Sequence, residues 1–133
     1  MLKQLKKWFS KGTDDLHTTL PLNEHARFII TVDHLTIGIL ESMNGEWIFK
    51  YTEEFKEHKD KDKYKLIVGF PDVDKEYRSQ SLWPFFRIRI PGLKQPSVQR
   101  IIKEEHIDQD NEVALLKRFG HRTISNPYEL VPE

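Results

Sequence analysis

Three neighbouring segments of the chain are rich in apolar residues, and mainly polar residues separate them. The segments are residues 28–32, 35–40 and 47–51, and β-branched and aromatic side chains dominate them. Asp33 and His34 mark the first turn. Asn44 and Gly45 mark the second, because both residue types tolerate the positive φ of a tight hairpin. The pattern predicts three consecutive antiparallel strands, a β-meander.

A short helix and a fourth strand are expected after the meander. Thr52 is suited to cap a helix over residues 52–55, since acidic residues follow it in the first turn. Residues 64–70 are rich in apolar and β-branched side chains and stop at Pro71, which predicts the strand. Residues 72–81 are polar and show no clear pattern.

Residues 81–91 fit two different structures. Apolar and basic side chains alternate from Phe86 to Ile90, which favours a strand with Arg87 and Arg89 on one face. Pro84 equally suits the first position of a helix, with Ser81 near its cap. The sequence leaves helix and strand open here.

Two helices and a short final strand complete the predicted fold. Apolar residues recur at helical spacing over residues 96–105, with Ser97 as a possible cap, and over 110–119, with Asp110 or Asn111 as the cap. Gly120 ends the second helix. After a turn at residues 126–127, a short strand is expected near the end of the chain. The fold class is therefore α+β: a small antiparallel β-meander sheet with helices packed on one side.

Residues 1–26 differ from the domain predicted for residues 27–133. Leu2, Leu5, Trp8 and Phe9 recur at helical spacing with lysines between them, which indicates a short basic amphipathic helix in an N-terminal extension. Such a helix could contact a membrane surface, dock on a partner, or either cap the domain's own core or form a loosely held arm. We favour a core cap or a loosely held arm, since one or two turns of basic helix are a weak signal.

The length, charge and composition of the chain reduce the number of protein classes to which it could belong. A chain of 133 residues corresponds to one domain. Lysine plus arginine and aspartate plus glutamate both number 21, so direct nucleic-acid binding, which usually needs a basic excess, is not expected. No cysteine is present, which excludes disulfides and thiolate metal sites. No apolar run approaches the ~20 residues of a membrane span, so we expect a cytoplasmic protein.

The sequence offers no candidate catalytic residue. Six glycines are scattered singly and form no phosphate-binding loop, and six histidines lack metal-ligand spacing. The acidic stretch around His106 is more typical of a helix end than of a metal site, because the calcium-loop glycine is missing. We therefore expect no catalytic activity, no cofactor and no metal.

One cluster of aromatic and basic residues suggests a binding surface. These residue types are enriched at protein-binding hot spots, and they also suit base stacking and phosphate contact. The candidate partner-binding residues are Tyr77, Arg78, Trp83, Phe85, Phe86, Arg87 and Arg89. For the two phenylalanines a place in the core is favoured, whereas core and partner contact remain equally open for Trp83.

The order of several short phrases resembles the N-terminal subdomain of HipA-type serine/threonine kinases, the toxins of bacterial toxin–antitoxin systems. The phrases are residues 37–40, the Asn-Gly turn with the aromatic strand at 44–51, the Phe-Phe and proline at 85–91, and Leu-Leu-x-x-x-Gly at 115–120. The resemblance covers roughly residues 28–131. Gly92 replaces the acidic residue that the family has after the proline, and residues 121–126 depart from the family pattern.

The resemblance implies a separately encoded, HipS-like subunit, because the ATP-binding and catalytic parts of such kinases are missing from this chain. A subunit of this kind is expected to be non-catalytic and to act as an antitoxin that binds and inhibits a HipA-like kinase core lacking its own N-terminal subdomain. A helix-turn-helix DNA-binding protein is the usual third partner. The alternative is a nucleic-acid-binding or transcription-regulating accessory domain of a toxin–antitoxin complex.

Overall fold

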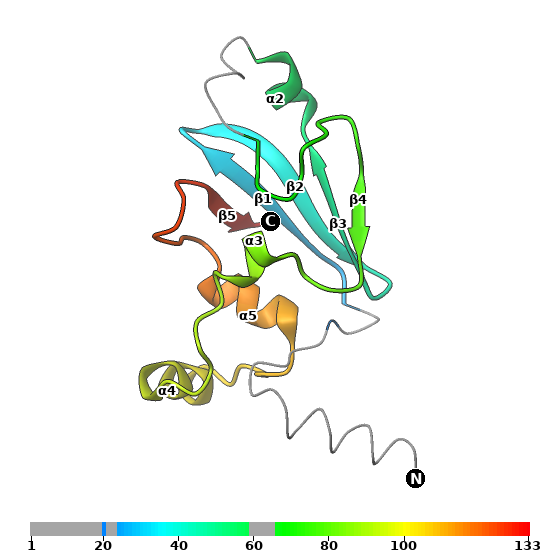
Figure 1. The fold of residues 1–133 in the computed structure, drawn as a ribbon. Helices are drawn as coiled ribbons and strands as arrows, with labels where there is room; N and C mark the ends of the chain where they lie inside the picture. Colours follow the sequence, from blue (N-terminus) through cyan, green and yellow to red (C-terminus); the bar gives the residue numbers. More distant parts are fainter. Residues whose placement is uncertain (1–19, 21–23, 59–65) are drawn as a thin grey trace.

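Five antiparallel strands form one sheet in the order β4-β3-β2-β1-β5 (Figure 1). The computed structural model describes residues 20, 24–58 and 66–133, so the amphipathic helix predicted near the N-terminus lies outside the described residues. The strands are β1 (Ala26–Val32), β2 (Leu35–Met43), β3 (Glu46–Tyr51), β4 (Tyr77–Ser79) and β5 (Glu129–Pro132). The predicted meander and the short final strand are confirmed.

Helices α2 (Glu53–Glu57), α3 (Pro84–Arg87), α4 (Pro96–Glu104) and α5 (Glu112–Phe119) complete the described fold. Thr52 caps α2 as expected, since its hydroxyl accepts a hydrogen bond from the Phe55 amide. Asn111 caps α5 in the same way, through the Ala114 amide. α4 begins at Pro96 with Gln95 at the N-cap, so the cap predicted at Ser97 is wrong by two residues.

Of the two structures that fit residues 81–91, the helix is the one that forms, as α3. Pro84 lies at its first position, where a missing backbone N–H costs nothing. The amides of Phe86 and Arg87 both donate to the carbonyl of Trp83, which is the N-cap residue in place of Ser81. The alternation of apolar and basic residues therefore does not mark a strand here.

The fourth strand predicted at residues 64–70 is wrong where the structure describes it. Residues 66–70 form a turn, in which the Phe70 amide donates to the Ile67 carbonyl and Gly69 adopts a φ of 97°. The hydroxyl of Tyr51 bonds backbone groups of Ile67 and Phe70, which therefore need no neighbouring strand. The edge position beside β3 is taken instead by β4, in the segment that showed no pattern.

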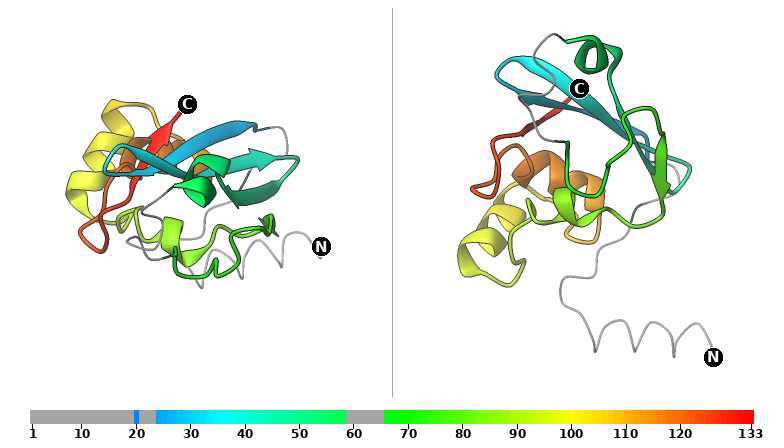
Figure 2. Two further views of the ribbon diagram at one scale, coloured as in Figure 1. Left: turned by 90° about the horizontal axis from the view of Figure 1, so that it is seen from above. Right: turned by 45° about the horizontal axis from the view of Figure 1, so that its top comes forward.

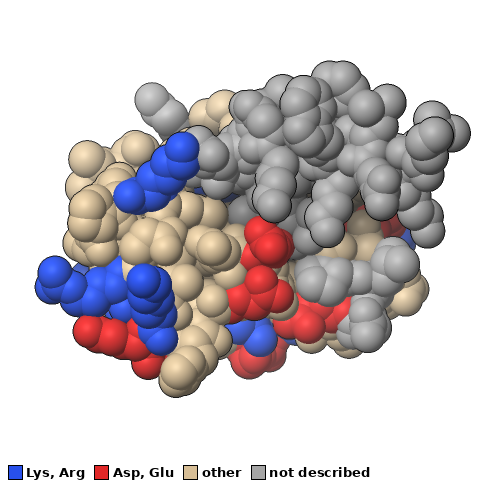
Figure 3. All heavy atoms as spheres, turned by 90° about the horizontal axis from the view of Figure 1, so that it is seen from below, with Lys and Arg blue, Asp and Glu red and all other residues tan. Residues whose placement is uncertain are grey.

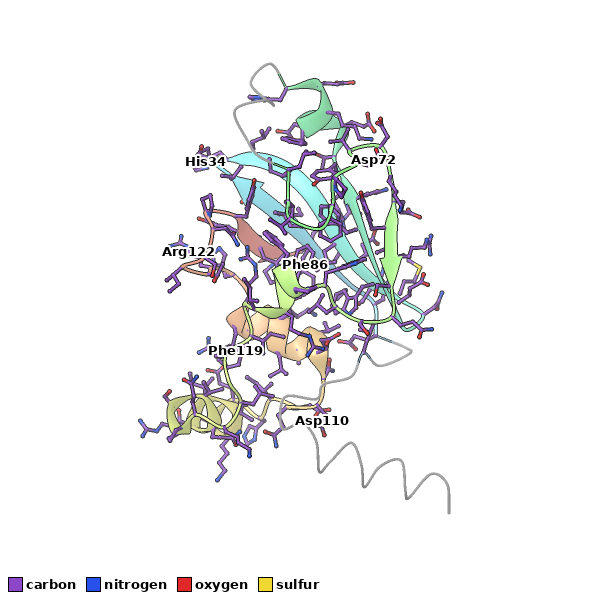
Figure 4. The ribbon with its side chains drawn as sticks, in the orientation of Figure 1. His34, Asp72, Phe86, Asp110, Phe119 and Arg122 are labelled. Atoms are coloured by element: carbon purple, nitrogen blue, oxygen red, sulfur yellow. The ribbon has the colours of Figure 1, made fainter. Side chains whose placement is uncertain are left out.

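The hydrophobic core lies between one face of the sheet and the helices. Phe28 on β1 and Phe49 on β3 are fully buried, and they pack in one cluster with Phe86 of α3 and Leu116 of α5. Phe86 lies on α3, which is in front of the sheet in Figure 4. Gly38 lets the sheet accept Phe49, because a Cβ atom at this position would lie 2.7 Å from the phenyl ring. The predicted fold class, α+β with the helices on one side, is confirmed.

A second, smaller cluster fixes α4 to α5. Leu93, Val98 and Ile102 pack on Leu115, which is fully buried. Figure 2 shows α4 beside α5 at one end of the molecule. The last two helices thus form a unit of their own that joins the sheet through α5.

Candidate docking groove

An apolar groove with a volume of about 770 Å³ opens where three segments distant in sequence meet. One wall is the turn at residues 66–69, the second is α3 with its flanking residues, and the third is the loop before β5. The lining residues are Val32, Leu66, Ile67, Val68, Gly69, Trp83, Pro84, Phe85, Ile88, Ser125, Asn126, Pro127 and Tyr128. None of these thirteen residues carries a charge. Grooves of this size and character are typical binding sites.

Large apolar side chains stand exposed along this groove. Val68 is 83% exposed, Ile88 53% and Leu66 39%. Single exposed apolar residues are common on protein surfaces, but several around one hollow mark an interaction site. Ile124 is also exposed but does not line the groove, so it provides a matched control.

Tyr51 holds the turn that forms the first wall. Its hydroxyl donates to the Phe70 carbonyl at 2.6 Å and accepts from the Ile67 amide at 3.1 Å. Burial raises the pKa of Tyr51 to about 12, so the phenol keeps its proton well above neutral pH. The turn thereby gains a fixed anchor on β3.

Replacing Tyr51 with phenylalanine is expected to lower the free energy of unfolding by about 1–3 kcal/mol, because two buried backbone groups lose their partner. The raised folded pKa means that the contribution of Tyr51 is complete below its unfolded pKa of about 10. It is then lost as the pH rises through the folded value of about 12. Urea unfolding of both proteins at neutral and alkaline pH checks this. A stability difference that stayed constant up to pH 12 would contradict the assignment.

Aromatic contacts join the three walls. The Trp83 ring meets the Phe70 ring edge-on, with the ring centres 5.0 Å apart. Phe85 meets Tyr128 edge-on at 5.8 Å. Trp83 and Phe85 are therefore half-buried: one side of each packs on the core and the other is available to the groove.

Arg89 lies directly behind the third wall, and its side chain is buried. Nη1 donates to the carbonyls of Gly120 and His121 at 3.2 and 3.4 Å. Nη2 donates to Asn126 Oδ1 and to the Tyr128 carbonyl, both at 3.0 Å. Burial lowers the pKa of Arg89 to about 10, so the guanidinium remains a cation at neutral pH. Within the described residues, no carboxylate forms an ion pair with it.

The structure brings only part of the predicted partner-binding cluster to this groove. Trp83 and Phe85 line it, while Phe86 is core. Tyr77 packs on Phe70, and its hydroxyl accepts a hydrogen bond from the Asp72 amide. Partner contact by these residues stays a prediction. No sequence pattern indicated a binding role for Val68, Ile88 or the loop at 125–128, because their exposure or position depends on the fold.

The arginines of the cluster do not form a basic surface. Arg78 pairs with Glu46 and Glu76 at the sheet edge, and Arg87 Nη2 lies 3.0 Å from a carboxylate oxygen of the buried Glu112. The face seen in Figure 3 likewise has acidic side chains beside the basic ones. Phosphate contact by these arginines would therefore compete with existing ion pairs.

Neither a metal-binding cluster nor a membrane-spanning helix lies in the part of the chain that the structure describes. No cluster of three histidine, aspartate or glutamate side chains is placed to hold a metal ion there. No described helix has the length and apolar character needed to cross a membrane.

Comparison with known families accounts for most of the chain. The HipA N-terminal domain family matches residues 28–125, which include most of β1, strands β2 to β4, all the described helices and most of the groove. Comparison with curated proteins gives no match. The HipA N-terminal domain is a non-catalytic subdomain. Because the match spans well over half of the sequence, the chain belongs to the HipA N-terminal domain family.

Proposed function

We propose that the protein is a non-catalytic, antitoxin-like subunit that docks through its apolar groove on a HipA-like serine/threonine kinase core encoded separately, and inhibits that kinase. The observation that carries the proposal is the groove with exposed Val68 and Ile88, whose described lining residues are all uncharged. Family membership supports the choice of a kinase core as the partner. A helix-turn-helix DNA-binding protein is the third member that we expect in the complex.

Covering the groove stabilises a complex by removing apolar surface from water. The gain is about 25 cal/mol for each Å² of apolar surface that is buried. Half-buried aromatic residues add to this, since Trp83 and Phe85 are already held by ring contacts and lose little conformational freedom on binding. The groove is therefore suited to hold a partner segment firmly, and inhibition would follow from steric restriction of the kinase.

Aspartate at Val68 or at Ile88 is expected to weaken binding to the kinase core by about 30-fold, the equivalent of ~2 kcal/mol, because a charge would be buried in an apolar interface. Both residues are exposed in the free protein, so the fold should tolerate the changes. Titration calorimetry with a purified kinase core lacking this domain measures the affinity. Co-expression with the same kinase measures neutralisation of toxicity.

The matched control is Ile124→Asp, which changes an exposed isoleucine outside the groove and should leave both readouts unaltered. Undiminished affinity and neutralisation in both groove variants would refute the docking proposal. Nucleotide turnover by the purified protein alone would refute the non-catalytic role.

A further inference from the structure

We propose that the groove selects a partner segment that places a carboxylate among large apolar side chains, because Arg89 puts a positive charge that no described carboxylate neutralises directly behind the groove wall. This inference rests on the proposed function, since it specifies the chemistry of the segment that the kinase core would supply. The apolar side chains of the partner segment would fill the apolar groove, and the carboxylate would face the wall formed by Phe85, Asn126 and Tyr128.

One layer of residues separates the charge from the groove. The guanidinium carbon of Arg89 lies 5.2 Å from the centre of the Phe85 ring. Its Nη2 atom is hydrogen-bonded to Asn126 and to Tyr128. Phe85, Asn126 and Tyr128 all line the groove. The cation therefore contacts the back of three lining residues whose other sides face a prospective ligand.

The charge of Arg89 is not balanced by the described part of the protein. All four of its hydrogen bonds end on neutral oxygens, and its Nε atom is buried without a hydrogen-bond partner. The neighbouring carboxylate of Glu129 already pairs with His121 and Arg122 at the surface. A buried cation is costly when it is unpaired, and its field is poorly screened by salt. An anion in the groove would thus gain attraction and relieve part of this cost.

Two dyes with the same aromatic body separate charge recognition from apolar binding. Anilinonaphthalene sulfonate carries an anionic group, whereas its parent phenylnaphthylamine is neutral. Fluorescence titration of both dyes is carried out on the full chain. Ile88→Ser should weaken the binding of both dyes, while Ile124→Ser should weaken the binding of neither. This pattern would show that the dyes bind in the groove.

Asn126→Asp then tests the role of Arg89 without removing it. The change is isosteric and places a carboxylate oxygen at the atom that already accepts the Arg89 hydrogen bond. Neutralising the charge of Arg89 in this way should lower the affinity for the sulfonate dye about tenfold, because charge interactions are strong in a low-dielectric site. Binding of the neutral dye should stay within about twofold. Asn44→Asp, the same change in the exposed β2–β3 turn, should affect neither dye.

The results separate this inference from the proposed function. Equal effects of Asn126→Asp on both dyes, or equal effects of the two aspartate variants, would overturn the inference. Binding of the kinase core could be lost in Ile88→Asp but unaffected in Asn126→Asp. This result would support the proposed function and would disprove the selection of a carboxylate-bearing segment. Concentration-dependent dimerisation abolished by Ile88→Ser would make a second copy the occupant and overturn the inference as well.

Discussion

Arg89→Met is expected to lower the free energy of unfolding by about 3 kcal/mol, because hydrogen bonds from a charged donor contribute ~1.5–3 kcal/mol each and relief of the buried charge offsets part of the loss. The guanidinium ties the residues after α5 to the end of α3 through four hydrogen bonds. Methionine fills a similar volume but donates to none of these acceptors. The loop at 120–128 should therefore loosen, and with it the third wall of the groove.

Arg122→Met is the control for this prediction. Arg122 has a side chain 73% exposed and pairs with Glu129 at 3.4 Å, so its loss should change stability by no more than ~0.5 kcal/mol. Urea unfolding followed by tryptophan fluorescence measures both variants. If the two variants were equally stable, the role of Arg89 as a structural clamp would be disproved.

Arg87→Met is expected to cost about 3 kcal/mol, because it removes the cation from a carboxylate that the fold buries. The side chain of Glu112 is only 3% exposed. One of its oxygens lies 3.0 Å from Arg87 Nη2, and the other accepts the indole N–H of Trp47 at 2.7 Å. The pair thus joins α3, α5 and β3 at one point in the core.

Arg118→Met provides the matched control, since Arg118 also pairs with a glutamate at 2.8 Å. There, however, the side chain of Glu105 is 45% exposed, and the expected cost is at most ~1 kcal/mol. Thermal unfolding measures both changes. The combined variant Arg87→Met with Glu112→Gln should be more stable than Arg87→Met alone, because the amide removes the buried negative charge and its oxygen can still accept the indole N–H of Trp47. A combined variant that was less stable would contradict the explanation.

Local patterns predicted those parts of the fold that depend on neighbouring residues. The meander was predicted from segments rich in β-branched and aromatic residues and from the Asn44-Gly45 turn, both of which act over a few residues. The strand predicted at residues 66–70 does not form, because the hydroxyl of Tyr51, which is distant in sequence, bonds the backbone groups of this segment. β4 was missed for the same reason: three polar residues become a strand only because the edge of β3 is available.

The types of residue in the sequence allowed only part of the candidate site to be predicted. Trp83 and Phe85 were identified as possible contacts and do line the groove. Nothing in the sequence distinguishes Arg78, which is exposed, from Arg89, which is buried under loop carbonyls. The groove itself could not be predicted, because Val68, Ile88 and Tyr128 come together only through tertiary packing.

We propose that the groove is the surface through which the protein contacts the kinase core. Hydrogen–deuterium exchange of the protein, alone and in complex with that core, tests it most directly. We expect slower exchange on binding at residues 66–70, 83–88 and 125–128. Protection confined to other segments, with these three exchanging as fast as in the free protein, would contradict the claim.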